Sequence, residues 1–591
     1  MAHKVAILGG GVGGLTVAHE LKRVAGDKVD VTVYERNPVV GGKARSMAKK
    51  TDGPGKDLPG EHGFRFFPGY YQHVIRTMEQ VPYPIGSPTG KVVDNLVEAR
   101  VTAFARTTGK VLELPNRFPH SIREMVELFT FGGKVRIPMH KAVGFARALR
   151  NFMCACDERR LAEFENQSWF DFCGAEPGDA ETGAGSNFKK YLADGLNQRT
   201  VAASGKDVSA RTVALTLVRI MNDWLTLGKC IDRVLDGPTS ERWLEPWHAH
   251  LEDLGVRFEL DATLVAMTHH AGAATSATVR RSDGSTTAIE ADSYVAALPM
   301  ADAREVFVSS GMAIEATGLA GLAATDVPLK DDWMNGIQLY FDAPLGMAPG
   351  HTIYVDSQLS LTSISQGEFW ADIDLAQYGD GSVRGVLSVD ISDWNTECSG
   401  SGRTAKQMTR DEVKDEVIEQ VRAHVTSTYG PLPNLVDWHL DPSITELDAP
   451  GPDGCRLANS AGLFINTTSS WDRRPVPVLR ETGGLANLYI ASDYAQTTTD
   501  LATMEGANEA GRRAARGVLQ QMGEPDSVVD AVELFDFPEP DMFERHRLED
   551  KDAWDDAQPP AGEPGGDVVG FGMGGGPVVP PMDAANLPEE W

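Results

Sequence analysis

A cluster of glycines near the start of the chain has the spacing that binds the phosphates of a nucleotide. The cluster comprises Gly9, Gly11, Val12, Gly13 and Gly14, and its glycines fit G-x-G-x-x-G. In that pattern the first glycine permits a sharp turn, the second lets a pyrophosphate approach the backbone, and the third lets a helix pack closely on a strand. Glu35 follows at the separation where an acid binds a ribose hydroxyl group. Together these residues predict a dinucleotide site.

The segments around the glycines have the patterns of a strand, a helix and a second strand. Residues 4–8 and 29–34 read as short strands, and the residues between them have helical spacing. A helix that begins after the glycines would offer unpaired N–H groups and a partial positive charge to the phosphates. The alternative is a tight turn that only packs a helix on a sheet, and such a turn would not require the acid at position 35.

The residues that follow Glu35 indicate which dinucleotide is bound. After an Arg-Asn-Pro turn the chain continues as Gly-Gly-Lys-Ala-Arg over residues 41–45. Here the sequence resembles the flavoprotein superfamily of amine oxidases and phytoene desaturases, which place a Gly-Gly-Arg or Gly-Gly-Lys turn near the pyrophosphate of FAD. The resemblance implies FAD as the cofactor, with contacts from Arg36, Gly42, Lys43, Ala44 and Arg45. The alternative is a solvated basic turn.

Two later segments carry the same resemblance. Residues 487–517 are similar to the C-terminal flavin motif of the superfamily, although Ser492 stands where the family usually has glycine. Residues 254–267 are similar to the strand at which such chains return to the cofactor domain. The further cofactor contacts that the resemblance implies are Leu264, Asp493, Thr503, Met504 and Ala507.

A segment dense in aromatic residues, 61–71, also carries one glutamate, one histidine and one arginine. It resembles the E-x-G-x-H-x-F-x-G-x-Y segment of plant-type carotene desaturases and squalene-pathway dehydroxylases, with Arg65 in place of the histidine. We interpret it as a pocket wall beside the flavin; the alternative is an aromatic core segment with a buried ion pair. The candidate catalytic residues are Glu61, His62, Arg65 and Glu505. The base could be Glu61, His62 or Glu505, among which the sequence makes no choice.

Amine oxidases of the superfamily differ from this chain in one checkable feature. They carry Tyr or Trp shortly after the position of Asp493, whereas residues 497–501 here read Thr-Thr-Thr-Asp-Leu, and no cysteine lies near. We therefore expect a desaturase-type enzyme that removes a hydride from a lipophilic, isoprenoid substrate, with the flavin supplying the redox chemistry. The alternatives are an oxidase acting on a C–N or C–O bond, a redox-neutral isomerase, and a flavin-binding protein without turnover.

Composition narrows the class of protein further. The chain has 591 residues, a net charge of −29 and 42% hydrophobic residues, which suits several folded domains and argues against nucleic acid as a partner. No apolar run of about eighteen residues is present and a strand begins by Lys4, so we expect neither a membrane-spanning helix nor a signal peptide. The six cysteines lack metal-ligand spacing. We expect reduced thiols, no metal and a cytoplasmic protein, and assign no oligomeric state.

One basic segment stands out in this acidic chain. Residues 129–153 contain no acid and interleave basic with apolar residues; the bases are Lys134, Arg136, Lys141, Arg147 and Arg150. Such an element can rest on anionic headgroups while its apolar face enters the bilayer. We expect a peripheral contact with the inner face of the membrane. The alternative is a packed helix with a solvated basic face.

The expected fold class is α/β, with an α+β substrate domain and a helical insertion. A discontinuous FAD-binding domain of Rossmann type is predicted from residues 1–75, 237–300 and 455–520. Helical spacing predicts a substrate- or membrane-facing helical region at 76–236, and alternation predicts antiparallel strands at 301–454, with a helix over 411–428. Residues 521–591 contain eighteen acids and three bases and become rich in Gly and Pro, which predicts an acidic tail.

Overall fold

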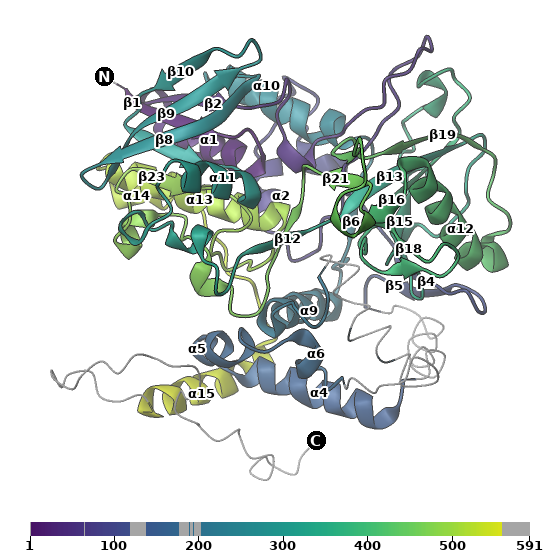
Figure 1. Cartoon of the computed structure of the whole chain (residues 1–591). Helices are drawn as coiled ribbons and strands as arrows, with labels where there is room; N and C mark the ends of the chain where they lie inside the picture. The colour runs from purple at the N-terminus through teal and green to yellow at the C-terminus, as the bar shows by residue number, and fades with distance from the viewer. Residues whose placement is uncertain are drawn as a thin grey trace.

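The computed structural model describes residues 2–63, 65–118, 137–175, 188, 193 and 203–557. Figure 1 shows these residues as a lobe built on a parallel sheet, a lobe built on a larger mixed sheet, and a lobe of helices beside both.

The parallel sheet brings together distant stretches of the chain. Its strand order is β23-β11-β1-β2-β7 and every pairing is parallel. The strands are β1 His3–Leu8, β2 Val29–Tyr34, β7 Arg257–Glu259, β11 Ser293–Ala296 and β23 Leu488–Ile490. Helix α1, Val12–Ala25, connects β1 to β2 as a crossover. The expected Rossmann-type α/β class is confirmed.

Alternate residues of β1 point into two different cores. Val5 and Ile7 pack with the helices on one face, which are α1, α10 (Glu245–Asp253) and α13 (Met504–Gln521). Ala6 and Leu8 pack on the other face with α11 and a three-stranded antiparallel sheet. That second layer consists of β8 Ala262–His270, β9 Ala273–Arg281, β10 Thr286–Ile289 and α11 Met300–Ser309. Because both faces are covered over residues 5–8, that part of the strand is apolar and buried.

The larger sheet has seven strands in the order β19-β13-β16-β15-β14-β4-β5. The strands are β4 Val101–Ala105, β5 Leu112–Pro115, β13 Asn335–Phe341, β14 Gly350–Tyr354, β15 Thr362–Ser365, β16 Gly385–Ile391 and β19 Leu435–Leu440. Helix α12, Arg410–Tyr429, begins at a Thr409 capping box and buries Val413, Val417 and Val421 against this lobe, as expected for 411–428.

The region 76–236 differs from the mainly helical expectation. Strands β4 and β5 belong to the larger sheet, and β3 (Leu96–Glu98) pairs with β6 (Arg233–Leu235). The physical reason is the parallel pairing of β4 with β14, since a partner so distant in sequence leaves no trace in local spacing. The other short ladders are β12 Lys330–Asp332 with β22 Leu463–Ile465, β17 Glu397–Cys398 with β18 Arg403–Thr404, and β20 Ile444–Glu446 with β21 Leu457–Asn459.

The C-terminal part of the chain packs on the helical lobe. The α-helices of the described residues not yet named are α2 His73–Met78, α4 Met139–Cys154, α5 Asp157–Arg159, α6 Trp169–Phe172, α9 Ala210–Leu225, α14 Asp526–Val529 and α15 Glu544–Ala557. In α15 the buried Asp550 carboxylate accepts hydrogen bonds from the backbone N–H of Cys156 (2.8 Å) and from Arg159 (3.1 Å). Residues 521–557 are thus packed on the body; the Gly/Pro-rich end from 558 lies outside the described residues.

Candidate active site

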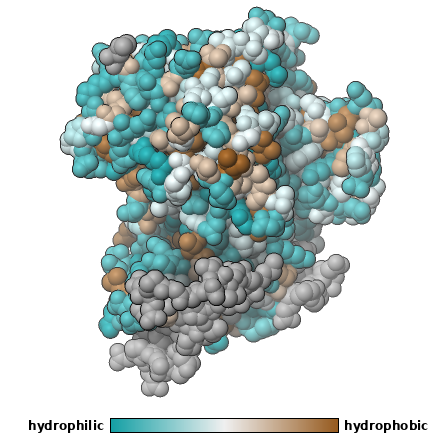
Figure 2. All heavy atoms as spheres, turned by 60° about the vertical axis from the view of Figure 1, so that its left-hand side comes forward, coloured by the Kyte–Doolittle hydropathy of each residue, from teal (hydrophilic) through white to brown (hydrophobic). Residues whose placement is uncertain are grey.

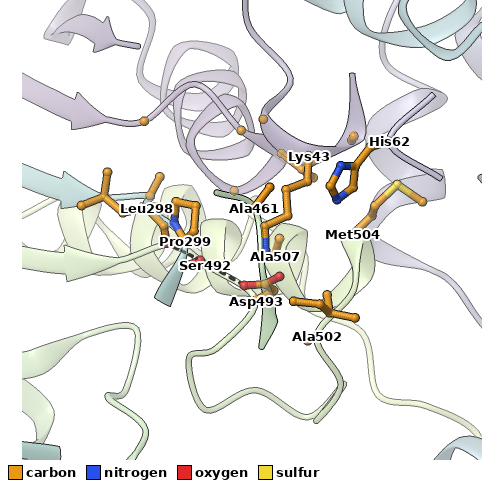
Figure 3. Close-up of a pocket in the computed structure, with 18 of the residues that line it drawn as sticks. Lys43, His62, Leu298, Pro299, Ala461, Ser492, Asp493, Ala502, Met504 and Ala507 are labelled. Atoms are coloured by element: carbon orange, nitrogen blue, oxygen red, sulfur yellow. Dashed lines mark hydrogen bonds between the residues drawn. The ribbon is translucent and has the colours of Figure 1, made fainter. Parts of the chain in front are cut away.

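A cavity of about 940 Å³ lies where the parallel sheet, the larger sheet and α9 meet. Its lining includes the turn after β1, the 41–45 turn, β8, and the N-terminal end of α13. Figure 3 shows residues from several of these segments around one space, among them Lys43, Asp493 and Met504. Of the predicted site residues, those that line it are Gly9, Gly11, Val12, Gly13, Glu35, Arg36, Gly42, Lys43, Ala44, Arg45, His62, Arg65, Leu264, Asp493, Thr503, Met504 and Ala507.

Each glycine of the β1–α1 turn is required for a different structural reason. Gly9 has a φ of +116°, and a side chain there would overlap the carbonyl of Ala297. Gly14 does not line the cavity; a Cβ there would overlap the Gly9 carbonyl, so this glycine lets α1 pack closely. Gly11 faces open cavity, since the nearest atom to its hypothetical Cβ is the Cα of Gly42 at 3.8 Å. That open approach fits a pyrophosphate against the backbone.

Glu35 is held in place at the edge of the cavity. One carboxylate oxygen accepts a hydrogen bond from the Gly10 backbone N–H at 2.7 Å, and the other accepts from the Asn37 backbone N–H at 2.9 Å. Beside it, Arg36 pairs with Asp302 of α11 at 2.9 Å, and both line the cavity. The position suits a ribose-binding acid.

The 41–45 turn is held by cationic side chains. Lys43 Nζ donates to the carbonyl of Gly462 at 2.6 Å, and Arg45 donates to that of Gly42 at 2.9 Å. The Arg65 guanidinium donates to the carbonyls of Lys43 and Ala44. The contacts of Arg65 therefore support the turn that would adjoin the pyrophosphate.

Helix α13 begins at the cavity. Thr503 is its N-cap and accepts from the Gly506 N–H at 3.2 Å. Because α13 runs for 18 residues, its N-terminus presents partial positive charge to a bound anion or reduced flavin. Ser492 donates to the carbonyl of Leu298 at 2.7 Å and lies 3.3 Å from Asp493 Oδ1 (Figure 3). The Ser492 hydroxyl thus connects the turn at Asp493 to the segment after β11. Ser492 occupies the position at which the family usually has glycine.

The candidate bases separate clearly in the structure. His62 lines the cavity and pairs through Nδ1 with Asp441 Oδ2 at 2.5 Å. Glu61 lies outside the lining, where it accepts from Ser46 Oγ at 2.8 Å and the Thr239 N–H at 3.0 Å. Burial raises the pKa of Glu61.

Glu505 also lies outside the lining and holds the start of α2. Its Oε1 accepts from the N–H groups of Gln72 (2.8 Å) and His73 (2.7 Å) and from His73 Nδ1 (2.9 Å), while Oε2 accepts from the Val74 N–H (2.9 Å). With both oxygens occupied and no access to the cavity, Glu505 has the contacts of a structural residue.

We expect Glu505→Gln to lower stability without changing chemistry. The amide nitrogen that replaces one oxygen would face a buried N–H donor, which costs about 1–3 kcal/mol. Denaturant unfolding measures this loss, and the rate of flavin reduction per bound FAD should stay at the wild-type value. A large fall in that rate in correctly folded protein would restore Glu505 as a base.

The apolar wall of the cavity includes residues that sequence reasoning did not assign. Val213, Leu217 and Ile220 project from α9, a spacing of one helix face that could have been read as a wall. Tyr70 and Tyr71, which belong to the 61–71 segment interpreted above as a pocket wall, also line the cavity, with their rings 5.3 Å apart and edge to face. The remaining lining from the larger lobe includes Met334, Asp390, Pro442 and Ser443.

The sequence matches the family of flavin containing amine oxidoreductases over residues 12–323 and 364–519. The chain belongs to this family. It is therefore an FAD-dependent oxidoreductase, and the flavin expected from the sequence motifs is confirmed. The glycine turn, Glu35 and the α13 N-terminus, which converge on one cavity, fit that cofactor.

Solved structures share the fold at low sequence identity. The putative protoporphyrinogen oxidase from Exiguobacterium sp. is 14% identical, with a TM-score of 0.56 over 88% of this chain and 99% of that one. Cyclohexylamine oxidase from Brevibacterium oxydans is 13% identical, with a TM-score of 0.53 over 89% and 100%. Putrescine oxidase bound to putrescine is 14% identical, with a TM-score of 0.53 over 88% and 99%. No curated protein matches the sequence.

Proposed function

We propose that this family member removes two hydrogens from a lipophilic, isoprenoid-type substrate. The observation that carries the proposal is the apolar wall formed by Val213, Leu217 and Ile220 of α9 together with the tyrosines 70 and 71. A hydrocarbon substrate needs such a wall for binding, because burial of apolar surface is its main source of affinity. The resemblance of segment 61–71 to desaturases supports the same class.

Bound FAD supplies the acceptor for a hydride. The chain's own residues bind and orient it: the turn at Gly11 would hold the pyrophosphate, and Glu35 the ribose. The N-terminus of α13 would stabilise negative charge on the reduced ring. The α9 wall excludes water from the space beside the reacting carbon.

Oxidation of an amine is the second candidate, and two observations favour it. The matched family is named for amine oxidoreductases, and Tyr70 and Tyr71 place aromatic rings on the cavity even though residues 497–501 carry none. An aromatic face attracts an amine cation. A redox-neutral isomerase is the further alternative.

Anaerobic stopped-flow absorbance distinguishes these candidates. The flavin-loaded protein is mixed separately with a panel of terpenoid hydrocarbons and terpenols and with a panel that includes cyclohexylamine and putrescine. We expect bleaching of the visible flavin band by a member of the terpenoid panel. Bleaching by amines alone would establish amine oxidation instead. No bleaching by either, with full FAD content, would favour the isomerase.

We further propose a peripheral membrane contact through α4. Helix α4 contains most of the described part of the basic segment. Its residues Met139 (77%) and Val143 (41%) are exposed, and Arg147 is exposed on the same side of the helix. Residues 129–136 lie outside the described residues. In the described part of the chain, no helix has both the length and the apolar character to span a bilayer. Figure 2 shows a largely hydrophilic surface with small hydrophobic groups on the face in view.

Liposome co-sedimentation at low salt tests this contact. We expect binding to vesicles with anionic lipids and loss of most of that binding in Val143→Glu, because a carboxylate is repelled by the headgroups and costly to insert. Val308→Glu, at a similarly exposed position (48%) of α11, is the matched control and should bind normally. Absence of wild-type binding would remove the proposal.

A further inference from the structure

His62 and Asp441 form a buried pair at the wall of the cavity. Nδ1 of His62 lies 2.5 Å from Oδ2 of Asp441, whose side chain is fully buried, while the His62 side chain keeps 10% exposure. His62 lines the cavity and Asp441 does not. Because Nδ1 is engaged with Asp441, we infer that the opposite edge of the ring, which carries Nε2, faces the cavity. Figure 3 shows the His62 ring among the lining residues.

The partners of Asp441 decide which nitrogen of His62 carries the proton. Oδ2 of Asp441 also accepts from Asn335 Nδ2 at 2.6 Å, and Oδ1 accepts from the Ser443 N–H at 2.8 Å. Surrounded by donors, the carboxylate acts as an acceptor only, so His62 Nδ1 must donate to it. In the neutral ring the lone pair is then on Nε2, the atom available to take a proton.

Backbone hydrogen bonds also hold His62 and Asp441 in place. The Gly336 N–H donates to the carbonyl of His62 at 2.6 Å, and the Asp441 N–H donates to the carbonyl of Gly336 at 3.0 Å. Both residues are therefore anchored to the same point of β13. The side chain of Asn335, the first residue of that strand, also orients the carboxylate. The ring has little freedom to rotate away from the cavity.

Burial and the neighbouring charges together favour a neutral His62 imidazole. The pKa of His62 is lowered, mainly by burial; Asp441 opposes this shift, and the nearby Arg65 and Lys43 add to it. Burial opposes ionisation of Asp441, yet the hydrogen bonds from His62, Asn335 and the Ser443 N–H lower the pKa of Asp441. At neutral pH the pair is therefore a carboxylate beside a neutral imidazole.

We propose that His62 Nε2 is the base that takes the substrate proton, and that Asp441 positions it. The proposal rests on the function proposed above. The substrate loses two hydrogens: one leaves with two electrons as a hydride to the flavin, and the other leaves as a proton to Nε2 of His62. The imidazolium that forms is stabilised by the Asp441 carboxylate and later gives its proton to solvent.

A substrate-free experiment tests whether Nε2 is available. The flavin-loaded protein is treated with diethyl pyrocarbonate, which acylates neutral imidazole, from about pH 5 to about pH 9, and His62 is followed by peptide mass spectrometry. We expect His62 to react, and to react at least about tenfold more slowly in Asp441→Asn, because the amide can donate to Nδ1 and move the proton to Nε2. An unreactive wild-type His62, beside modified surface histidines, would overturn the proposal.

The chain offers a matched control for that variant. His424, which is buried, and Asp356, whose side chain is 22% exposed, form another histidine–carboxylate pair in the larger lobe, with Nε2 2.9 Å from Oδ1, and neither lines the cavity. Asp356→Asn should leave the reactivity of His62 within about twofold of wild type, since it removes an equally polar contact elsewhere. An equal fall in both variants would mean that a general loosening of the lobe, rather than positioning by Asp441, is responsible, and would overturn the role of Asp441.

Flavin reduction by any compound that bleaches the wild type gives the second readout. We expect His62→Gln to slow the reduction by about 10²- to 10⁴-fold with FAD still bound, and to abolish the fall in rate that the wild type shows at acidic pH. A rate and pH profile like those of the wild type would overturn the proposal. If no compound bleaches the wild type, the proposed function fails, while the acylation result still decides the state of Nε2.

Discussion

Replacing Gly11 with valine is expected to give a folded protein that has lost its flavin. The Cβ at this position would meet no atom closer than 3.8 Å, so the fold itself has room for a side chain. The space that the side chain would fill is the part of the cavity where the pyrophosphate must approach the backbone of α1. We expect the Kd for FAD to rise by at least about 100-fold, close to 3 kcal/mol.

The measurement is the FAD content of the purified variant, followed by titration of the stripped protein with FAD. Circular dichroism should show that Gly11→Val retains its secondary structure. By contrast, Gly13→Val should disturb the fold itself, because a side chain there would overlap the Ala491 carbonyl and separate α1 from the segment after β23. Gly144→Ala, on α4 in open space, is the control that should bind FAD normally. Wild-type affinity in Gly11→Val would place the pyrophosphate elsewhere.

Replacing Asp500 with alanine is expected to cause the largest loss of stability. Asp500 is fully buried and accepts from Arg211 at 2.7 Å, from Arg474 at 2.5 Å and from Thr212 at 3.0 Å. It thereby joins the start of α9 to the C-terminal flavin segment. Its removal would leave the buried Arg474 guanidinium without its charge partner, which costs about 3–5 kcal/mol.

Denaturant unfolding followed by circular dichroism and by release of FAD measures this loss. The neighbouring ion pair of Arg473 with Asp326 is the matched control, because its side chains are 37% and 64% exposed. Asp326→Ala should cost less than about 1 kcal/mol. Equal losses in the two variants would show that the Asp500 contacts add little, and that the arrangement of α9 relies on apolar packing alone.

Most residues proposed to bind the cofactor were predicted from sequence and line one cavity, because the chemistry of such a site is local. A pyrophosphate contacts a glycine turn and the helix that follows it. The pattern of Gly9, Gly11 and Gly14 can therefore be recognised within a few residues of sequence. The same holds for Thr503 and Met504 at the start of α13, where a cap and a helix terminus are adjacent in the chain. The fold class followed from these segments, since each requires a parallel strand before its helix.

The candidate bases can be told apart only from their contacts in the folded protein. Glu505 and His62 were equal candidates in the sequence, yet one accepts hydrogen bonds at the start of α2 and the other lines the cavity. What distinguishes them is contact with residues far along the chain: His73 for Glu505, and Asp441 for His62. Local motifs were thus enough to predict the flavin and the turns proposed to bind it. Which side chains line the cavity depends on long-range pairing of strands and side chains, because the environment that sets the proton affinity of a side chain is assembled only on folding.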